Sequence, residues 1–429
     1  YAADKKELKA GDIITKIGNQ SLQDMDRDQL SQLLKGATNA SLDLEVYRQG
    51  EKITVTVFTE KVVINPVPFY DLIDNETGYI ILTRFNEKSS SEVKKAFNAL
   101  KKRGMKKLVF DLRGNPGGSL GEAINISNFF LPKGSTIVST KAKVKKWSTI
   151  YRASNTPLDL EIPLTILVNN KSASASEIVA GALQDFDRAV IIGERSFGKG
   201  LVQKYINLTY GTQLKLTISK YYTPSGRCIQ ELDYANRDKN GKVPKFSEGS
   251  ISSFKTKNDR VVFDGGGITP DILIGFSKRN ETTNELIKSR AIFNFTIDYF
   301  YKNPSISSVT DFSLSSSDFN SFLNYIKLSD TVFETTQERL FLDAYKSSEE
   351  IKFIDKEYQQ IKMKLLQEKI SKISKNQDFL SEIIKDQILI RYYYKKGSYE
   401  NKLKNDSVIL EAVKILKNKN QYAKILKGA

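Results

Sequence analysis

The stretch Leu108-Val-Phe-Asp-Leu-Arg-Gly-Asn-Pro-Gly-Gly118 places a continuous apolar run directly before a glycine-rich turn. An apolar run such as Leu108–Leu112 is typical of a strand buried on both faces of a parallel sheet, and a helix is expected to follow as far as Leu131. Successive free N–H groups in such a turn suit a phosphate or a developing oxyanion. This is not a Walker loop, because no Gly-Lys-Ser/Thr follows. A purely structural strand-to-helix turn is an equally good interpretation.

The same succession of buried strand, small-residue turn and helix recurs further along the chain. Leu164–Val168 is a second apolar run, and Ser172-Ala-Ser-Ala-Ser-Glu177 separates it from a helix that we expect to end near Asp185. Strands that alternate with helices predict a layered α/β domain, for which we take residues 63–280. Its other expected elements are a helix over Ser90–Lys102 and strands over Tyr79–Phe85, Val190–Ile192, Leu214–Tyr222 and Asp271–Ile274.

Segments of different character flank and interrupt this domain, so the predicted fold class is multidomain α/β. Residues 231–263 are polar and charged almost throughout, which predicts an exposed insertion. Residues 285–429 predict a helical C-terminal domain, where Ile351, Ile354, Tyr358, Ile361 and Leu365 recur at spacings of three and four. Residues 1–62 predict a small α+β module with strands over Ile13–Ile17, Leu42–Tyr47 and Ile53–Phe58 and a helix over Arg27–Lys35.

The composition excludes several kinds of catalytic site. The 429 residues include no histidine, which rules out a Ser-His-Asp triad, a Cys-His dyad and histidine-ligated metal sites. The single cysteine, Cys228, cannot form an internal disulfide or a cysteine-rich zinc site. A hydrolase built on this chain must move its proton with lysine, a carboxylate, tyrosine or water. We expect neither a metal nor a cofactor.

Charge and hydropathy bear on partners and location. The net charge is +16, but the basic residues are mostly lysines interleaved with acids, so nucleic acid is not the expected partner. Binding of an anionic polymer stays open as an alternative, with a steep salt dependence as its signature. No apolar run approaches the roughly 20 residues of a membrane helix. The chain begins at Tyr1 rather than methionine, so we expect upstream residues, including a signal segment, to have been removed.

Two residues are candidates for nucleophilic chemistry. Ser174 lies near a helix N-terminus, although Ser174-x-x-Glu177 is also the capping-box pattern that any helix can use. Lys199 lies in Ser196-Phe-Gly-Lys-Gly-Leu-Val-Gln203. A lysine acts as a general base only when neutral, and a shift of its pKa from about 10.4 to about 7 corresponds to roughly 4–5 kcal/mol. Burial could supply that shift, but spacing alone does not select Lys199.

These segments together resemble the carboxyl-terminal processing peptidases, or tail-specific proteases, of the S41 serine peptidase family. The resemblance is dense over 78–275, weaker over 1–60 and nearly absent after 285. It is carried, in order, by Phe110–Gly118, Leu167–Asp185, Gly193–Gln203, Tyr221–Gln230 and Asp264–Asp271.

The resemblance implies a Ser-Lys dyad and an acyl-enzyme mechanism. The nucleophile falls on Ser174, the general base on Lys199, and a residue that orients the lysine amine on Gln203. The oxyanion hole would be the backbone N–H of Ala175 with that of Gly117 or Gly118. Asp185 also matches a family position, and we expect a structural role for it at the helix end. The implied activity is endoproteolysis near unstructured C-terminal tails of protein or peptide substrates.

The N-terminal module resembles part of a PDZ domain, through Leu8-Lys-Ala-Gly-Asp-Ile-Ile-Thr-Lys-Ile-Gly-Asn-Gln20 and the helix over Arg27–Lys35. PDZ domains add an extended tail as a strand, but their carboxylate-binding loop and first strand lie before this part and are lacking here. The family implies a bacterial periplasmic or cell-envelope protein, with an envelope adaptor as a further partner. The alternative is a catalytically inactive PDZ-containing scaffold of the envelope.

Overall fold

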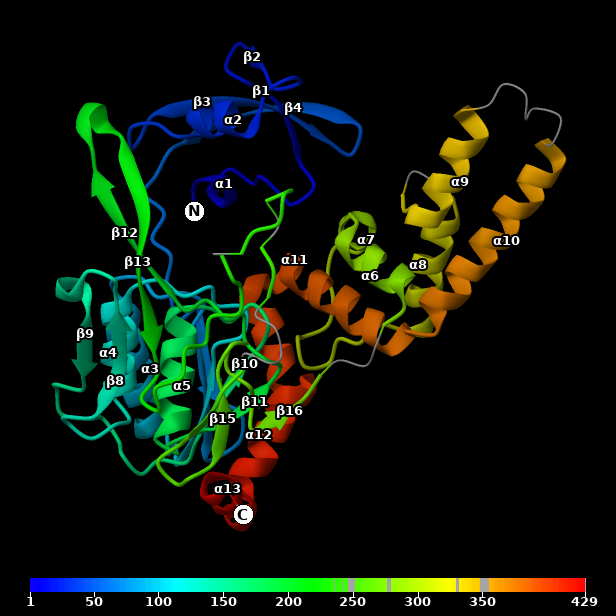
Figure 1. Ribbon diagram of the computed structural model, residues 1–429. Coiled ribbons are helices and arrows are strands. Elements are labelled where there is room, and N and C mark those ends of the chain that lie inside the picture. Colours follow the sequence, from blue (N-terminus) through cyan, green and yellow to red (C-terminus); the bar gives the residue numbers. More distant parts are fainter. Residues whose placement is uncertain are drawn as a thin grey trace. The chain divides into compact units, whose positions relative to one another are not determined.

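The computed structural model describes residues 1–234, 236–241, 243–245, 251–275, 279–328, 332–347 and 355–428. The chain forms two compact units, each made of segments that are distant in sequence (Figure 1). The first unit joins Tyr1–Ile64 to Ser277–Asn401. The second unit joins Asn65–Phe276 to Lys402–Ala429 and contains all the candidate site residues.

The N-terminal part of the first unit is a four-stranded antiparallel sheet in the order β2-β1-β3-β4. Its core is the apolar cluster of Ile17, Leu44, Val46 and Val57. Helix α2 begins with a capping box, in which Asp26 accepts the N–H of Gln29 at 2.9 Å. The elements are α1 (Ala2–Lys5), β1 (Ile13–Ile17), β2 (Gln20–Ser21), α2 (Arg27–Leu34), β3 (Ser41–Arg48) and β4 (Glu51–Phe58).

The rest of the first unit is helical, as expected from its apolar periodicity. Of the expected stripe, Tyr358 is buried but Ile361 is exposed, and Ile351 and Ile354 lie outside the described residues. The core consists instead largely of phenylalanine and isoleucine side chains from α7, α8 and α11, such as Phe295, Phe322 and Ile384. The helices are α6 (Glu281–Lys288), α7 (Ala291–Lys302), α8 (Ser316–Leu328), α9 (Thr336–Ser347), α10 (Asp355–Ser374) and α11 (Gln377–Asn405).

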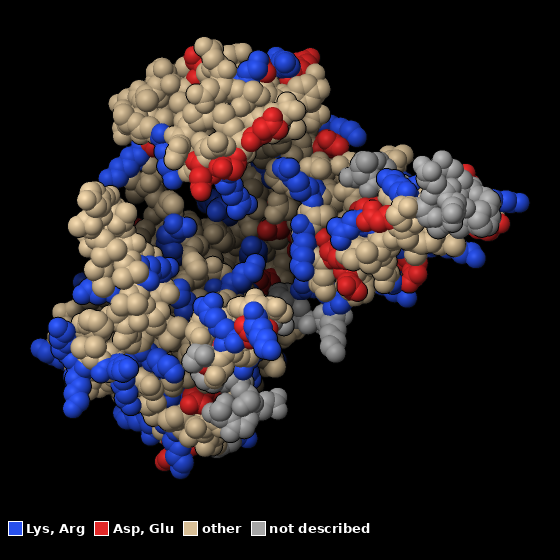
Figure 2. All heavy atoms as spheres, turned by 45° about the horizontal axis from the view of Figure 1, so that its top comes forward, with Lys and Arg blue, Asp and Glu red and all other residues tan. Residues whose placement is uncertain are grey.

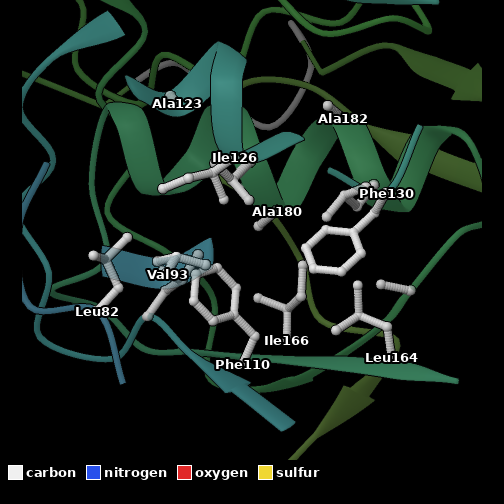
Figure 3. Packing of buried hydrophobic residues seen from close by; sticks show 14 of the residues in the cluster. Leu82, Val93, Phe110, Ala123, Ile126, Phe130, Leu164, Ile166, Ala180 and Ala182 are labelled. Atoms are coloured by element: carbon white, nitrogen blue, oxygen red, sulfur yellow. The ribbon is translucent and has the colours of Figure 1, made fainter. Parts of the chain in front are cut away.

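The second unit is built on a six-stranded sheet in the order β16-β11-β10-β7-β6-β5, parallel except for β5. Helices α3, α4 and α5 connect successive parallel strands, and right-handed crossovers place them on one face. Figure 3 shows Phe110, Leu164 and Ile166 packed beneath these helices. The elements are β5 (Phe69–Leu72), β6 (Thr77–Ile81), α3 (Ser89–Lys102), β7 (Lys107–Asp111), α4 (Leu120–Asn128), β10 (Leu164–Val168), α5 (Ala175–Asp185), β11 (Val190–Gly193) and β16 (Ile272–Leu273).

The last two helices, α12 (Ser407–Lys417) and α13 (Lys419–Lys427), pack on the strands of this sheet. Helix α12 contacts β7, β10 and β11 with one apolar face, which includes Val408, Ile409 and Leu416. The expected helical domain over 285–429 therefore divides, because residues 402–429 belong to the second unit. These residues are helical as expected, but helical character alone does not say which part of the fold a helix packs on.

A second sheet, in the order β12-β13-β8-β9, is antiparallel and lies beside the site. Strand β12 is at its edge and carries Gln203, which pairs with Thr217 of β13. Its elements are β8 (Thr136–Lys141), the 3-10 turn η1 (Lys145–Trp147), β9 (Thr149–Arg152), β12 (Leu201–Asn207), the 3-10 turn η2 (Thr209–Gly211) and β13 (Gln213–Tyr222).

The segment 231–263 is less exposed than its composition suggests. Residues 235, 242 and 246–250 lie outside the described residues. The second half forms a hairpin of β14 (Ser253–Lys255) and β15 (Val261–Phe263), in which Val262 is buried. Next to it, Arg260 forms ion pairs with Asp187 and with Asp271, the latter at 2.6 Å. These pairs bury most of Arg260, which lies in the segment that was expected to be exposed.

On the face shown in Figure 2, basic side chains are scattered among acidic and uncharged ones and do not gather into one continuous patch. Among the described residues, no helix combines the length and the apolar character needed to cross a membrane.

Candidate active site

Two strand-to-helix turns meet at one edge of the parallel sheet. Strands β7 and β10 are parallel neighbours, so the turns that follow them lie side by side. Backbone and side-chain hydrogen bonds join the turns. Ala173 N–H donates to the carbonyl oxygen of Asn115 at 3.0 Å, and Ser172 Oγ donates to that of Leu112 at 2.8 Å. Both small-residue segments singled out from the sequence therefore belong to one site.

Gly117 is the point of closest approach between the two turns. Its φ is +97°, and a Cβ atom built on it would lie 2.7 Å from the carbonyl oxygen of Ala173 and 2.9 Å from the nitrogen of Ala175. Any other residue would push the turns apart, so glycine is required here by space as well as by conformation.

Ser174 has an unusual backbone conformation, with φ 56° and ψ −111°. Non-glycine residues rarely adopt positive φ, and such a conformation is destabilising by about 1–3 kcal/mol. Both polar backbone groups of Ser174 are held: its N–H donates to Glu177 Oε2 at 2.7 Å, and its carbonyl oxygen accepts from Tyr221 Oη at 3.2 Å. The surrounding structure thus fixes a strained, half-buried serine at the start of α5.

The N–H groups expected to form an oxyanion hole are not equivalent. The N–H of Gly117 already donates to Asn115 Oδ1 at 2.9 Å. By contrast, neither Gly118 nor Ala175 donates its N–H to an acceptor in the described part of the chain. Gly118 packs against the main chain of Phe85, where an added Cβ would lie 2.1 Å from the carbonyl oxygen. Between the two glycines expected, Gly118 has the available donor.

Lys199 and Gln203 come from the segment between β11 and the middle of β12. The backbone N–H of Lys199 donates to Glu177 Oε2 at 2.9 Å, and the side chain is half-buried. Gln203 is exposed and follows an irregularity in the pairing of β12 at Val202. Among the described residues, no hydrogen bond joins the side chains of Lys199 and Gln203. Both side chains nevertheless line the same pocket.

This pocket has a volume of about 500 Å³, and all six residues expected from the sequence line it. They are Gly117, Gly118, Ser174, Ala175, Lys199 and Gln203. The remaining wall is formed by Pro116, Leu120, Thr140, Ile178, Leu201, Val202, Tyr205, Lys215 and Tyr221. The arrangement combines a serine, a lysine, free N–H donors and a partly apolar wall in one cavity.

Sequence reasoning missed two buried residues of this site. Burial raises the pKa of the Glu177 carboxyl, although hydrogen bonds from Ser196, Lys199, Gly198 and Ser174 oppose the shift. Burial, with the nearby Glu177 charge, raises the pKa of Tyr221 well above its usual value. The Ser-x-x-Glu pattern pointed to Glu177 only as a helix cap, because burial and contacts across the fold are not visible in a capping motif.

Asp185 lies in a different environment. It forms a buried ion pair with Arg227 at 2.7 Å and accepts the N–H of Ser225 at 2.9 Å. These contacts tie the end of α5 to the segment after β13, which agrees with the structural role expected for Asp185. In the described part of the chain, no cluster of three or more cysteine or acidic side chains could hold a metal ion.

Comparison with known proteins identifies three segments. Residues 76–235 match the model of peptidase family S41. Residues 1–48 match a PDZ domain, and residues 282–416 match the C-terminal helical domain of a probable PDZ-protease. The order is that expected from the sequence.

Named relatives agree with these matches. The chain is 31% identical over 245 residues to a chloroplastic C-terminal processing peptidase of Tetradesmus obliquus, covering 54% of this chain and 52% of that protein. It is 35% identical over 229 residues to a probable CtpA-like serine protease of Staphylococcus aureus, covering 53% of this chain and 45% of that protein. The chain thus spans about half the length of these curated relatives.

Among solved structures, the photosystem II D1 C-terminal processing protease is 28% identical, with a TM-score of 0.39 and coverage of 64% of this chain and 65% of that one. The matched segments and the named relatives confirm the resemblance to C-terminal processing peptidases. Residues 76–235 therefore match peptidase family S41, and the named relatives are serine-type peptidases; the chain also matches a PDZ domain before this segment and a PDZ-protease helical domain after it.

Proposed function

We propose that this protein is a serine endopeptidase with a Ser174–Lys199 dyad that cleaves proteins near unstructured C-terminal tails. One observation carries the proposal. Ser174, held in a left-handed conformation, lines the same pocket as Lys199 and the unpaired N–H donors of Gly118 and Ala175. Strain retained at a serine within a pocket is typical of a functional site.

The first half of the reaction forms an acyl-enzyme. Neutral Lys199 Nζ accepts the hydroxyl proton of Ser174 while Oγ attacks the carbonyl carbon of the scissile peptide bond. The N–H groups of Ala175 and Gly118 donate to the negatively charged oxygen of the tetrahedral intermediate. The Lys199 ammonium then gives its proton to the leaving amine nitrogen, and the C–N bond breaks. Gln203 orients the lysine amine during these transfers.

The second half releases the new C-terminus. A water molecule transfers a proton to Lys199 and attacks the ester carbonyl, and the same two N–H groups stabilise the second oxyanion. The ammonium returns a proton to Ser174 Oγ as the ester bond breaks, which regenerates the starting dyad. The proton that left with the amine product is thus replaced by one from the attacking water.

The shape of the site favours an extended, unfolded substrate. Strand β12 lies at the edge of its sheet, and four of its residues, Leu201, Val202, Gln203 and Tyr205, line the pocket. An edge strand can pair with an added peptide strand, which folded proteins offer mainly at unstructured termini. This supports protein or peptide substrates with free tails.

The proposal extends to location and partners. We place the protein outside the cytoplasm, in the periplasm or cell envelope of a bacterium, on the strength of its likeness to the CtpA-like proteases. An envelope adaptor that delivers substrates is a further proposed partner, and the PDZ domain is the natural surface for it. The competing idea of an inactive scaffold is weakened because Ser174, Lys199 and both free N–H donors line one pocket.

Casein cleavage tests this function directly. We expect the wild type to degrade casein, and Ser174→Ala and Lys199→Arg each to lose at least about 10³-fold in kcat, because arginine stays charged and cannot accept the proton. Lys204→Arg is the matched control, since Lys204 is an exposed lysine of β12 outside the pocket. Equal cleavage by the wild type and Ser174→Ala would reject the dyad.

A further inference from the structure

Glu177 links the segment that carries Ser174 to the segment that carries Lys199. Its Oε2 accepts two backbone N–H groups, that of Ser174 at 2.7 Å and that of Lys199 at 2.9 Å. Two bonds to one oxygen atom keep the two backbone nitrogens within two hydrogen-bond lengths of each other. We propose that Glu177 is a positioning residue that sets the separation of nucleophile and base; this rests on the proposed function.

The second carboxylate oxygen strengthens the same link. Glu177 Oε1 accepts from Ser196 Oγ and from the backbone N–H of Gly198, both at 2.6 Å. Three of the four donors therefore come from the short segment Ser196–Lys199, and the fourth is the nucleophile residue itself. An ionised carboxylate has about four acceptor positions, so the contacts use its full capacity.

Helix capping alone does not explain this arrangement. Glu177 is fully buried, and within the described residues it has no lysine or arginine partner. A buried carboxylate without a cation is destabilising unless hydrogen bonds compensate. Glu122 occupies the same third position of α4, but it is only half-buried and its carboxylate accepts one backbone N–H, from Ser90 at 2.6 Å. The N–H of the N-cap residue Ser119 donates to the carbonyl oxygen of Phe85, so α4 is capped without a bond to its glutamate side chain.

A carboxylate is required because every acceptor position faces a donor. In Glu177→Gln one oxygen becomes an NH₂ group, which then points either at the N–H groups of Ser174 and Lys199 or at Ser196 and Gly198. Either orientation breaks bonds to backbone N–H groups that cannot turn away. Protonation of Glu177 has the same effect, because it places an O–H where an acceptor is needed.

Kinetics of Glu177→Gln test the proposal, with Glu122→Gln as the matched control. On a fluorogenic peptide at about pH 8, we expect kcat to fall about 10- to 100-fold in Glu177→Gln with KM changed less than about 3-fold, since misplacement of reacting groups affects kcat. Glu122→Gln should stay within about 2-fold of the wild type. A fluorophosphonate that labels the active serine should react more slowly with Glu177→Gln in the same proportion.

The pH dependence separates positioning by the carboxylate from a general loss of structure. Burial raises the pKa of Glu177, so the group takes up its proton at a higher pH than an ordinary carboxyl. The ratio of kcat between the wild type and Glu177→Gln should therefore fall toward one as the pH decreases through that pKa. A ratio that stays constant with pH, or a Glu177→Gln variant as active as Glu122→Gln, would overturn the proposal.

A second variant, Ser196→Ala, tests the link even if Glu177→Gln does not fold. Ser196→Ala removes one donor and leaves the carboxylate in place, and we expect a loss of about 3- to 10-fold in kcat. If Glu177→Gln does not give a cooperative melting transition, Ser196→Ala decides: wild-type kcat in that variant would reject the link. Failure of the proposed function itself would look different, because the wild type and Ser174→Ala would then not differ.

Discussion

The two turns that form the site share one plan and differ in one respect. Each follows a strand of the parallel sheet and ends in a serine N-cap with glutamate three residues later, at Ser119 and Glu122 in one and Ser174 and Glu177 in the other. Ser119 has ordinary backbone angles, φ −62° and ψ 123°, whereas Ser174 has φ 56° and ψ −111°. The same capping pattern therefore holds a relaxed turn in one case and a strained one in the other.

The surroundings of a capping motif decide what its glutamate side chain contacts. Beside α4 the Glu122 carboxylate meets one N–H of a neighbouring helix. Beside α5 the Glu177 carboxylate meets the segment that follows β11, and that contact turns a helix cap into a connection between two candidate catalytic segments. Strain at Ser174 is retained because several contacts fix it at once.

The largest loss of activity is expected from a substitution at Gly117, where the two turns are in contact. In Gly117→Ala the new Cβ would meet the carbonyl oxygen of Ala173 at 2.7 Å, so the turns must separate. We expect kcat on casein to fall at least about 10²-fold, because a small misplacement of the proposed oxyanion donors would have a large effect.

Gly114→Ala is the control within the same turn. Gly114 also has positive φ, at +72°, but its Cβ position is open. We expect the control to lose about 1 kcal/mol of stability from backbone strain and to keep its activity within about 3-fold. Similar activity in Gly117→Ala and Gly114→Ala would show that contact between the turns is not needed.

A smaller effect, on the free energy of unfolding, is expected when the ion pair between Arg113 and Asp406 is broken. Arg113, nearly buried, donates to both oxygens of Asp406 at 2.9 Å, and Asp406 also caps α12. Asp406→Asn keeps the cap but removes the charge that faces Arg113, so urea unfolding should show a loss of about 1–3 kcal/mol. Glu411→Gln, which breaks an exposed pair with Lys414 in the same helix, should change stability by less than about 0.5 kcal/mol. Equal effects of the two variants would argue against a structural role for the partly buried pair of Arg113 and Asp406.

The smallest effect is expected in the pH dependence of the free energy of unfolding. Burial raises the pKa of Glu177 above the usual 4.5, so the folded protein holds this proton more tightly than the unfolded chain does. The stability of the wild type relative to Glu177→Gln should therefore decrease as the pH rises from about 4.5 through the folded pKa, and then stay constant. Urea titrations of both proteins between about pH 4.5 and about pH 8 measure this difference. A wild type that gains relative stability over that interval would mean that the hydrogen bonds outweigh burial.

Elements with strong local signals were predictable from the sequence. Strand β10 occupies the expected Leu164–Val168, because a run of apolar residues between Pro163 and Asn169 has no other good environment than a buried strand. The six candidate site residues were also found together, since the segments that carry them combine small residues with a serine or a lysine.

Features that depend on distant contacts could not be predicted. The pattern of Asp-x-Arg-Gly does not show that Arg113 would reach Asp406, nearly 300 residues later. A polar segment gives no sign that Arg260 would pair with Asp187 and Asp271. Similarly, two adjacent glycines look alike in sequence, and only the fold shows that Asn115 occupies the N–H of Gly117 and leaves that of Gly118 available.

Helix α12 packs on the parallel sheet although it is synthesised long after the strands of that sheet, and this has a consequence for folding on the ribosome. The face formed by β7, β10 and β11 stays uncovered until residues 407–417 have been made, because α12 packs directly on it. Chains emerge from the N-terminus, so the strands of this sheet leave the ribosome before the helix that covers them. The turn after β7 likewise lacks the bond between Arg113 and Asp406 until residue 406 has been made. The second unit therefore completes the packing of its parallel sheet only after α12 has been synthesised.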